Sequence, residues 1–347
     1  MGATVKAVVL VGGEGTRLRP LTETVPKPLL PMMDRPFLHY VLDHLAAHGV
    51  HEVVLSSSYL EASFRPFIES RHGDPAITWI TEARPLGTGG AIVNALRHLD
   101  DGPFLVLNGD ILTDLDLTAM TALHRERGAA ATIALTPVDD ARRYGLVSQA
   151  PDGRVLEFRE KPSEPAPGNV NAGTYVVDPA SLTGYTLDGP LSVEREVFPT
   201  LIGRGERVQA FGSAAYWMDV GTPETYLQAH FDVLEGRVRG LRYDAPFRAP
   251  DAEVDLRAHL GRWAVVGAGS RVGPDAEVED SVLHPGAVVD EGAAVRGSIL
   301  GQGARVGARA RVADSILAGG SRVLRGVELL HGRVSTGHVV GPEGPED

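Results

Sequence analysis

The chain has no cysteine among its 347 residues. This absence excludes disulfides, zinc sites built on thiolates and cysteine nucleophiles, and it fits a reducing compartment. No apolar run approaches the about 20 residues that a membrane-spanning helix needs. The stretch MGATVKAVVLVGG lacks a basic start and a small-residue cleavage site, so we expect a first β-strand there and not a signal peptide. The sequence therefore predicts a cytoplasmic protein with no membrane partner.

Positive charge is also scarce. Lys and Arg together number 33 against 45 Asp and Glu, which gives a formal net charge of −12. Because nucleic acids are polyanions, an acidic protein binds them poorly, and we expect no nucleic-acid partner. If the protein handles phosphates, it does so with a few placed cations or a metal ion. The length favours two domains.

The first part of the chain alternates short apolar runs with helical patterns. This alternation predicts a Rossmann-like α/β domain with a mixed, mostly parallel sheet. The stretch PSEPAPG is a loop by composition. Strands are expected over 5–11, 52–56, 77–80, 104–107, 131–136 and 174–177, and helices over 37–48, 60–70, 89–99 and 118–127.

The C-terminal part is a repeat with a period of 17 residues. Its segments AVVGAGSRV, SVLHPGAVV, SILGQGARV and SILAGGSRV align, with aliphatic residues in three registers six positions apart. This pattern is the hexapeptide signature of a parallel β-helix, which we expect to be left-handed. We place a first domain at 1–235, a linker at 236–262, the β-helix at 263–335 and a frayed tail at 336–347. The three registers begin at Val266, Val272 and Val278 and continue through Leu283, Val289, Val295, Leu300, Val306, Val312, Leu317, Val323 and Leu329.

A glycine loop follows the first predicted strand, in the stretch VGGEGTRLRPLTETVPKP. Glycines let backbone N–H groups approach an anion without interference from a Cβ, so the loop is a candidate phosphate cradle. It is not a Walker loop, because it continues Gly-Thr-Arg-Leu instead of Gly-Lys-Ser/Thr. It is not a dinucleotide fingerprint either, because Leu18 stands where the third glycine belongs. Arg17 and Lys27 bring two cations to this one loop, which favours a functional role.

The stretches GGEGTRLRPLT and PKPLLP resemble the signature of the sugar-1-phosphate nucleotidylyltransferases, also called NDP-sugar pyrophosphorylases. Further stretches match in order: EARPLGTGGAI, LNGDI, YGLV, REKP, NAGTY, SVEREVFP and WMDVGTPETY. The resemblance covers nearly the whole chain, because the family commonly joins a catalytic domain to a left-handed β-helix. It is strongest toward bacterial mannose-1-phosphate guanylyltransferases.

The resemblance implies a reaction and its residues. A sugar 1-phosphate attacks the α-phosphorus of a nucleoside triphosphate, and pyrophosphate leaves. Arg17 and Lys27 are the implied catalytic cations. Asp110 and Asp219 are the implied ligands of one Mg²⁺, which prefers oxygen ligands. Gly145, Glu160, Lys161 and Asn171 are the implied sugar-phosphate-binding residues. The implied nucleotide-binding residues are Leu10, Gly12, Gly13, Gly15, Thr16, Glu82, Gly87, Thr88, Asn108 and Gly109.

Glu82 bears on which nucleotide is used. Family members that use uridine or thymidine nucleotides tend to carry Gln at this position, and Gln both donates and accepts hydrogen bonds. A carboxylate only accepts, and guanine presents two adjacent donors, N1–H and N2–H₂. We therefore expect GTP as the nucleotide. The resemblance implies mannose 1-phosphate as the acceptor. Another nucleotide, or a glucose, heptose or cyclitol phosphate, stays an alternative.

The resemblance also leaves two readings of a different class. Some relatives are regulatory subunits that sense nucleotide sugars without turnover, but they often lose a phosphate cation or a metal carboxylate, and this chain keeps both. Other relatives carry acyltransferase activity on the β-helix with a histidine base, and His284 lies in one coil. A lone histidine is more often structural, so we expect the β-helix to serve as a scaffold for homo-oligomer formation or regulation.

Overall fold

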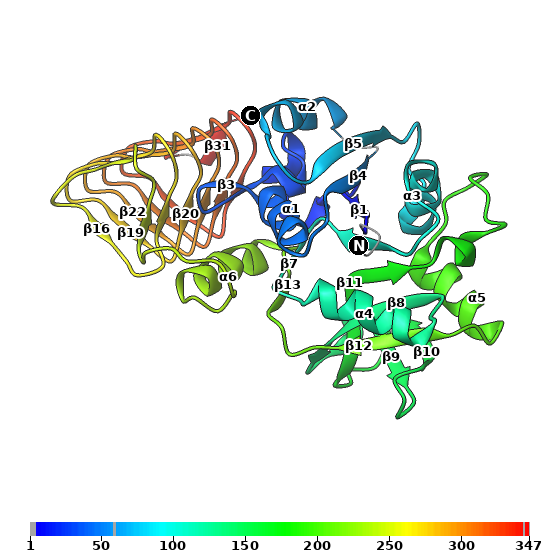
Figure 1. Ribbon diagram of the computed structural model, residues 1–347. Helices are drawn as coiled ribbons and strands as arrows, with labels where there is room; N and C mark the ends of the chain where they lie inside the picture. Colours follow the sequence, from blue (N-terminus) through cyan, green and yellow to red (C-terminus); the bar gives the residue numbers. More distant parts are fainter. Residues whose placement is uncertain (1–4, 58–59, 343, 347) are drawn as a thin grey trace. The chain divides into compact units, whose positions relative to one another are not determined.

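The computed structural model describes residues 5–57, 60–342 and 344–346 (Figure 1). The chain divides into two compact units: Met1–Gly13 with Leu38–Trp217, and Glu14–Phe37 with Met218–Asp347. The segment that carries Arg17 and Lys27 therefore packs with the C-terminal part of the chain. No helix in the described ranges is long and apolar enough to cross a membrane.

The first unit is built on a mixed sheet, which has nine strands in the described part of the chain. Strands β6, β1, β4 and β5 are adjacent in that order and all parallel, whereas β11 pairs antiparallel with β6, β8 and β9. The expected mixed, mostly parallel fold is confirmed. The strands are β1 (Ala7–Leu10), β4 (Glu52–Ser57), β5 (Ala76–Thr81), β6 (Phe104–Asn108), β8 (Ala131–Val138), β9 (Gly145–Gln149), β10 (Val155–Glu160), β11 (Gly168–Val177) and β12 (Val208–Gly212).

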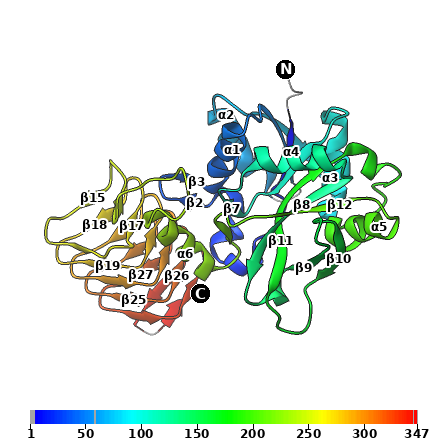
Figure 2. The same cartoon turned by 60° about the horizontal axis from the view of Figure 1, so that its bottom comes forward.

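Helices cover this sheet. α3 packs against β1 and β4. α4 packs against β8, β11 and β12 (Figure 2). Asp116 caps α4 by accepting a hydrogen bond from the Ala119 N–H, and Gly128 ends it in the left-handed conformation. The helices are α1 (Phe37–Ala47), α2 (Glu61–Ser70), α3 (Gly87–Ala95), α4 (Leu117–Arg127) and α5 (Phe198–Gly203).

The predicted strands and helices all occur, with end shifts of a few residues, except that β11 begins six residues before the predicted strand. β9, β10 and β12 were not predicted. β10 is an edge strand, and its Leu156 is 49 % exposed. An edge strand is not buried on both faces, so its sequence does not need the continuous apolar run that marks a central strand. The central strands β1, β6 and β11 have such a run. Their residues Val8, Val106 and Tyr175 lie in one buried core.

Short elements connect the larger ones. The chain passes from the first unit to the second within β13. The short strands are β2 (Pro31–Met32), β3 (Arg35–Pro36), β7 (Ile111–Thr113) and β13 (Trp217–Asp219), and the single turns of helix are η1 (Thr16–Leu18), η2 (Leu21–Glu23), η3 (Lys27–Leu29), η4 (Leu96–His98), η5 (Ala141–Arg143), η6 (Pro179–Leu182) and the π-helical η7 (Val193–Val197).

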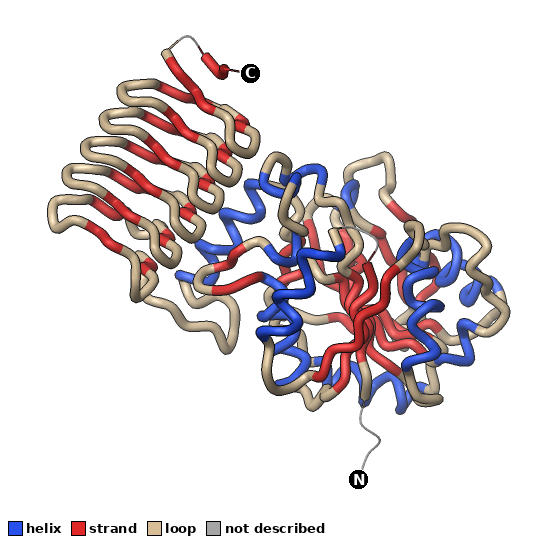
Figure 3. Tube along the Cα trace, turned by 90° about the horizontal axis from the view of Figure 1, so that it is seen from above, coloured by secondary structure: helices blue, strands red, loops and turns tan. Residues whose placement is uncertain are grey.

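The second unit contains a parallel β-helix, which confirms the prediction. The coils contribute short strands to three sheets, which are parallel except for the last pair β30–β31, and successive coils stack (Figure 3). The first sheet holds β14 (Phe247–Arg248), β17 (Val265–Val266), β20 (Val282–Leu283), β23 (Ile299–Leu300), β26 (Ile316–Leu317) and β29 (Arg333–Val334). The second holds β15 (Glu253–Val254), β18 (Arg271–Val272), β21 (Val288–Val289), β24 (Arg305–Val306), β27 (Arg322–Val323), β30 (Val339–Gly341) and β31 (Gly344–Glu346). The third holds β16 (His259–Leu260), β19 (Glu277–Glu279), β22 (Ala294–Arg296), β25 (Arg311–Ala313) and β28 (Glu328–Leu330).

The stacking follows the predicted registers. In the first sheet Val266 pairs with Leu283, Leu283 with Leu300, and Leu300 with Leu317, and these side chains are at most 1 % exposed. The second and third registers pair in the same way. The repeat therefore forms a continuous aliphatic core inside the coils.

The β-helix is longer than the repeat indicated. Its first strand begins at Phe247, inside the stretch 236–262 that was expected to be a linker, because Phe247 pairs with Val265. That spacing is 18 residues, and the first coil therefore falls outside a search for a period of 17. At the other end, β30 continues the second sheet into the stretch expected to be a frayed tail. Before the coils lies α6 (Pro223–Leu234), which Thr222 and Thr225 cap reciprocally.

Candidate active site

The first unit has a topological switch point between β1 and β6. The chain runs from β1 to β4 on one side of β1 and later returns to β6 on the other side. Open α/β sheets bind ligands at the carboxyl ends of the strands that flank such a point. Gly12 and Gly13 follow β1 there, and Gly109 and Asp110 follow β6.

Backbone packing at this point requires one of the predicted glycines. A Cβ on Gly109 would lie 2.8 Å from Val11 Cγ1 and 2.9 Å from Leu10 O, and the Gly109 N–H donates to Leu10 O. In contrast, a Cβ on Gly13 would meet no atom within 4 Å. Gly13 thus borders open space next to the ends of β1 and β6, as a residue that admits a ligand would.

In the second unit, Gly15 turns the chain into η1. Its φ of 61° lies in the left-handed region, and a Cβ would lie 3.0 Å from Thr22 Cγ2 and 3.2 Å from Lys27 Cβ. The Thr22 hydroxyl donates to Gly15 O at 2.8 Å. Leu18, which replaces the third glycine of a dinucleotide loop, is fully buried. Thr16 is exposed at the start of η1.

The two predicted catalytic cations meet one carboxylate in the second unit. Arg17 Nη2 lies 3.8 Å from Asp219 Oδ2, and Lys27 Nζ lies 3.7 Å from Asp219 Oδ1. Gly221 provides the room for this arrangement, because a Cβ there would lie 2.6 Å from Arg17 Nη2. Arg17 is 58 % exposed, whereas Lys27 is 10 % exposed. The structure thus brings Arg17, Lys27 and Asp219 together.

Glu82 follows β5 and is buried, with 8 % of its surface exposed. Its Oε1 accepts a hydrogen bond from the Ser56 hydroxyl at 2.8 Å, and its Oε2 accepts one from the Leu86 N–H at 3.1 Å. Because β1, β4 and β5 are parallel, Glu82 lies at the same sheet edge as Gly12 and Gly13. Glu82 does not point to solvent, and it also holds the turn that leads to α3.

The start of α3 packs tightly on another backbone. Gly87 has a φ of 72°, and a Cβ there would lie 2.5 Å from Leu191 O. The N–H groups of Gly89 and Gly90 both donate to Leu191 O. The Thr88 hydroxyl donates to Glu194 Oε2 at 2.7 Å and accepts from the Val193 N–H. The Thr88 side chain is therefore engaged within the protein.

The predicted sugar-phosphate residues lie on adjacent strands. Gly145 of β9 pairs with Glu160 of β10, and β9 also pairs with β11, which carries Asn171. A Cβ on Gly145 would lie 2.5 Å from the Phe158 ring and 3.0 Å from Glu160 Oε2. Lys161 is 58 % exposed and lies 3.6 Å from Glu160. Its φ of 49° is unusual for a residue other than glycine, and such backbone strain concentrates at functional sites.

A bulge in β11 directs Asn171. The register between β11 and β8 shifts between Asn171 and Tyr175, and Gly173 has a φ of 69°. Asn171 Oδ1 accepts from the Gly173 N–H at 2.9 Å, and Asn171 Nδ2 donates to the Tyr175 hydroxyl at 2.8 Å. Burial, reinforced by the charge of Glu194, raises the pKa of Tyr175 well above its ordinary value, so the hydroxyl stays protonated.

Sequence reasoning missed Glu194. The resemblance covers SVEREVFP only as a whole stretch and implies no role for any single residue in it. Glu194 lies in η7 and accepts hydrogen bonds from Thr88 and Ser192, with a longer one from Tyr175 at 3.4 Å. It thereby connects the predicted base side with the predicted sugar side. The π-helical turn was not visible in the sequence, although such turns are frequent at functional sites.

Asp110 and Asp219 belong to different units, so their joint role as metal ligands stays a prediction from the sequence. Within the described ranges, no three His, Cys, Asp or Glu side chains come together as a metal-binding group. The site residues thus form two sets. One lies in the first unit along the carboxyl edge of the sheet and its neighbouring strands, and the other surrounds Asp219 in the second unit.

The sequence matches two known protein families. Residues 6–236 match the family described as nucleotidyl transferase, and residues 245–339 match the GMPPB C-terminal domain. The first match alone covers more than half of the chain. The chain belongs to the nucleotidyl transferase family. A divalent metal ion is typical of nucleotidyl transferases.

Individual relatives agree with this assignment. The chain is 38 % identical over 302 residues to a mannose-1-phosphate guanylyltransferase of Mycobacterium tuberculosis. The matched region covers 84 % of this chain and 83 % of the relative. It is 35 % identical over 304 residues to a probable mannose-1-phosphate guanylyltransferase 2 of Arabidopsis thaliana, with coverage of 84 % and 83 %. Among solved structures, HddC from Yersinia pseudotuberculosis complexed with GMP-PN is 32 % identical. Its TM-score is 0.56, and it covers 65 % of this chain and 97 % of that one.

Proposed function

We propose that this nucleotidyl transferase transfers GMP from GTP to mannose 1-phosphate, which forms GDP-mannose and releases pyrophosphate. The observation that carries the proposal is the 38 % identity to the mycobacterial mannose-1-phosphate guanylyltransferase, which extends over 84 % of this chain. The complex of HddC with GMP-PN supports the choice of a guanine nucleotide. So does the buried Glu82 carboxylate, which can accept from two guanine donors.

The chemistry needs positioning and charge neutralisation more than covalent help. An oxygen of the sugar phosphate attacks the α-phosphorus of GTP, and the bond to the β,γ-pyrophosphate breaks. Arg17 would stabilise the charge that develops on the leaving pyrophosphate, and Lys27 would hold the α-phosphate. Their shared contact with Asp219 supports this assignment, because it keeps two cations at one point.

The nucleotide would occupy the switch point in the first unit. Backbone groups from Leu10 to Gly13 would approach its phosphates. Gly15 and Thr16, which belong to the second unit, are proposed as further phosphate contacts from the sequence. Asn108 and Gly109 would border it from β6. The guanine would lie against Gly87 and Thr88, with Glu82 accepting from its N1–H and N2–H₂. The open space beside Gly13 and the close packing of Gly109 support this placement.

The divalent metal ion would be Mg²⁺. Asp110 and Asp219 offer carboxylate oxygens, the ligand type that Mg²⁺ prefers, and phosphate oxygens and waters would complete the set. When bound, the ion would neutralise charge on the triphosphate.

The sugar phosphate would bind where β9, β10 and β11 lie side by side. Lys161 would bind its phosphate, Glu160 and Asn171 would accept from or donate to sugar hydroxyls, and Gly145 would let the sugar approach the backbone. The pairing of Gly145 with Glu160 and the bulge beside Asn171 support this grouping. We also propose a cytoplasmic location, supported by the lack of cysteine, and self-association through the β-helix.

Pyrophosphate release measured with Mg²⁺, four nucleoside triphosphates and a panel of sugar phosphates tests this function. Highest turnover is expected with GTP and mannose 1-phosphate. Preference for a heptose, glucose or cyclitol phosphate would correct the acceptor, and preference for UTP or dTTP would refute the assignment to GTP. Asp110→Ala and Asp219→Ala are each expected to abolish turnover. Nucleotide-sugar binding without release from any pair would favour a regulatory subunit.

A further inference from the structure

Tyr226 of α6 joins the β-helix to the segment that carries the catalytic cations. All of these residues belong to the second unit. Tyr226 is 1 % exposed, and its hydroxyl bonds to the carbonyl of Pro31, four residues after Lys27. The same hydroxyl lies 2.8 Å from Nε2 of His284, which follows β20 in the β-helix and is 3 % exposed. A buried chain of contacts thus leads from a coil to the loop.

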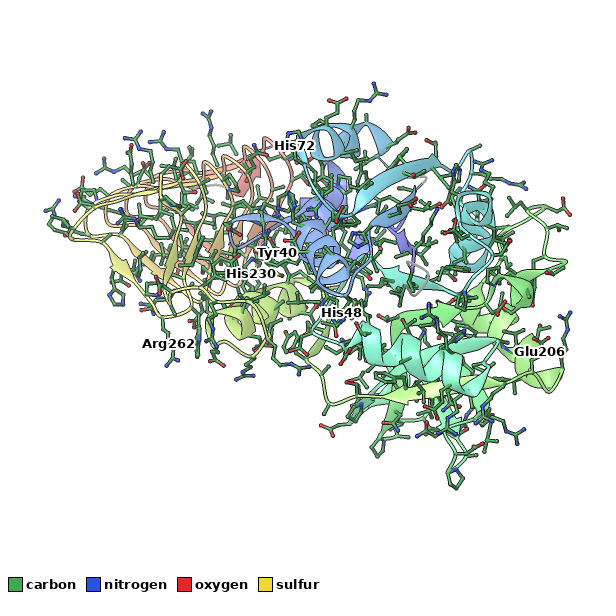
Figure 4. The ribbon with its side chains drawn as sticks, viewed as in Figure 1. Tyr40, His48, His72, Glu206, His230 and Arg262 are labelled. Atoms are coloured by element: carbon green, nitrogen blue, oxygen red, sulfur yellow. The ribbon has the colours of Figure 1, made fainter. Side chains whose placement is uncertain are left out.

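The protonation states determine which group donates and which accepts in each of these hydrogen bonds. Burial lowers the pKa of His284 to about 3, so its ring is neutral at neutral pH. The Pro31 carbonyl can only accept, and the Tyr226 hydroxyl must therefore donate to it. His284 must then carry its proton on Nε2 and donate to the Tyr226 oxygen. His230, labelled in Figure 4, lies one turn further along α6 and bonds through Nδ1 to the Tyr226 carbonyl.

Two further contacts hold the same segment. Arg333 of β29, in the same sheet as β20, donates from Nη1 to the carbonyl of Arg19 at 2.7 Å. The Tyr243 hydroxyl, from the connection between α6 and the coils, donates to Asp34 Oδ1 at 2.8 Å. The contacts at Arg19 and Pro31 lie on either side of Lys27, and Arg19 is two residues from Arg17. The C-terminal part of the chain therefore holds the cation-bearing segment on both sides.

We propose that His284 and Tyr226 are positioning residues for nucleotidyl transfer. The β-helix holds the Pro31 carbonyl through them and thereby fixes Lys27 and Arg17 relative to Asp219. The catalytic consequence rests on the proposed function, whereas the positioning itself does not. On this view, the coils are part of the working site, in addition to any role as a scaffold.

Hydrogen exchange measured by mass spectrometry tests the positioning without any turnover. The amides of Leu18, Leu29 and Leu30 donate within short turns of the segment, so peptides that cover 16–37 report its opening. Tyr226→Phe and His284→Met are expected to speed this exchange about 3- to 10-fold, the equivalent of one ordinary hydrogen bond. Peptides from β4 and β6 in the first unit serve as the internal reference.

Two variants make the test specific. His284→Gln keeps an N–H donor at the reach of Nε2 and is expected to restore slow exchange, whereas a merely space-filling role would make Met the better replacement. Tyr185→Phe is the matched control, because the Tyr185 hydroxyl is buried and no partner for it occurs within the described ranges. Unchanged exchange at 16–37 in Tyr226→Phe, or equal effects of Gln and Met at 284, would overturn the proposal.

Turnover separates this proposal from the proposed function. If wild type releases pyrophosphate, Tyr226→Phe and His284→Met are expected to lower kcat by about 3- to 10-fold or more, with His284→Gln and Tyr185→Phe close to wild type. A kcat that stays at the wild-type value in Tyr226→Phe would contradict the positioning role. If wild type releases none with any substrate pair, the proposed function fails, and the exchange measurement still decides whether His284 and Tyr226 hold the segment.

Discussion

Replacing Glu82 by Gln is expected to change which nucleotide the protein prefers. In wild type, Oε1 accepts from Ser56 and Oε2 accepts from the Leu86 N–H. Each carboxylate oxygen has two lone pairs, so one on each oxygen remains for a ligand. Two adjacent acceptors match the N1–H and N2–H₂ of guanine. They do not match uracil or thymine, which flank a single N3–H with carbonyl oxygens.

The Gln side chain can keep both internal contacts. The Leu86 N–H can only donate, so the amide oxygen must face it. The amide nitrogen then faces Ser56, whose hydroxyl can turn to accept. The ligand side changes from two acceptors to one acceptor and one donor. Guanine loses one bond to a charged group, which is worth about 1.5–3 kcal/mol, and kcat/KM for GTP is expected to fall about 10- to 150-fold.

The assay is pyrophosphate release with GTP, UTP, ATP and dTTP on wild type, Glu82→Gln and Ser56→Ala. Glu82→Gln is expected to lower turnover with GTP and to raise the ratio of UTP or dTTP turnover to GTP turnover. Ser56→Ala removes an internal donor but keeps the carboxylate. It should therefore lower turnover with all four nucleotides by a similar factor, which is smaller than the loss of GTP turnover in Glu82→Gln. A ratio in Glu82→Gln within twofold of wild type would refute this role of Glu82.

Three further predictions concern the ion pair of Arg17, the hydrogen bonds of Glu194 and the pH dependence of stability. Gly221→Ala places a methyl group 2.6 Å from Arg17 Nη2, so kcat for pyrophosphate release should fall at least tenfold while the melting temperature changes by only a few degrees; an unchanged kcat would contradict the ion-pair geometry. Glu194→Gln should raise KM for both substrates, because this carboxylate joins the two predicted binding sides; an effect on one KM alone would argue against that link. Burial lowers the pKa of His284 to about 3 and that of His230 to about 4, so below pH 6.5 the unfolded chain takes up protons that the folded chain does not. Stability in urea should therefore fall from pH 6.5 toward pH 4, by up to about 1.4 kcal/mol per pH unit for each histidine, and His284→Gln should remove about half of this part of the slope.

The sequence predicted the β-helix more accurately than the rest of the fold. Its registers at Val266, Val272 and Val278 are confirmed, because each coil contacts mainly its neighbours and the period records those contacts directly. Only the ends were misjudged, at Phe247 and Val339, where the spacing departs from the repeat or the pattern grows short. Strand β12 was missed because its partner β8 lies more than 70 residues earlier, whereas β9 and β10 form a local hairpin at the sheet edge whose sequence lacks a continuous apolar run.

The candidate site shows the same limit. Glycine positions such as Gly87 and Gly145 were found through matching stretches, and the structure adds the reason that a Cβ cannot fit. Glu194, Tyr226 and His284 were not assigned a role in the site, because each acts through contacts with residues more than 50 positions away. No local pattern reports such a contact.

The polar groups of the site differ in how far they are already held in place. The side chains of Glu82, Thr88 and Asn171 are hydrogen-bonded within the protein. Arg17 and Lys161, both 58 % exposed, are the cations proposed for the two phosphate substrates. A preorganised polar frame lowers the entropy cost of binding, whereas a long exposed cation such as Lys161 loses more side-chain freedom when an anion binds. Substrate binding is therefore expected to order Lys161 more than Arg17, which Asp219 already holds, while it leaves the network around Glu194 unchanged.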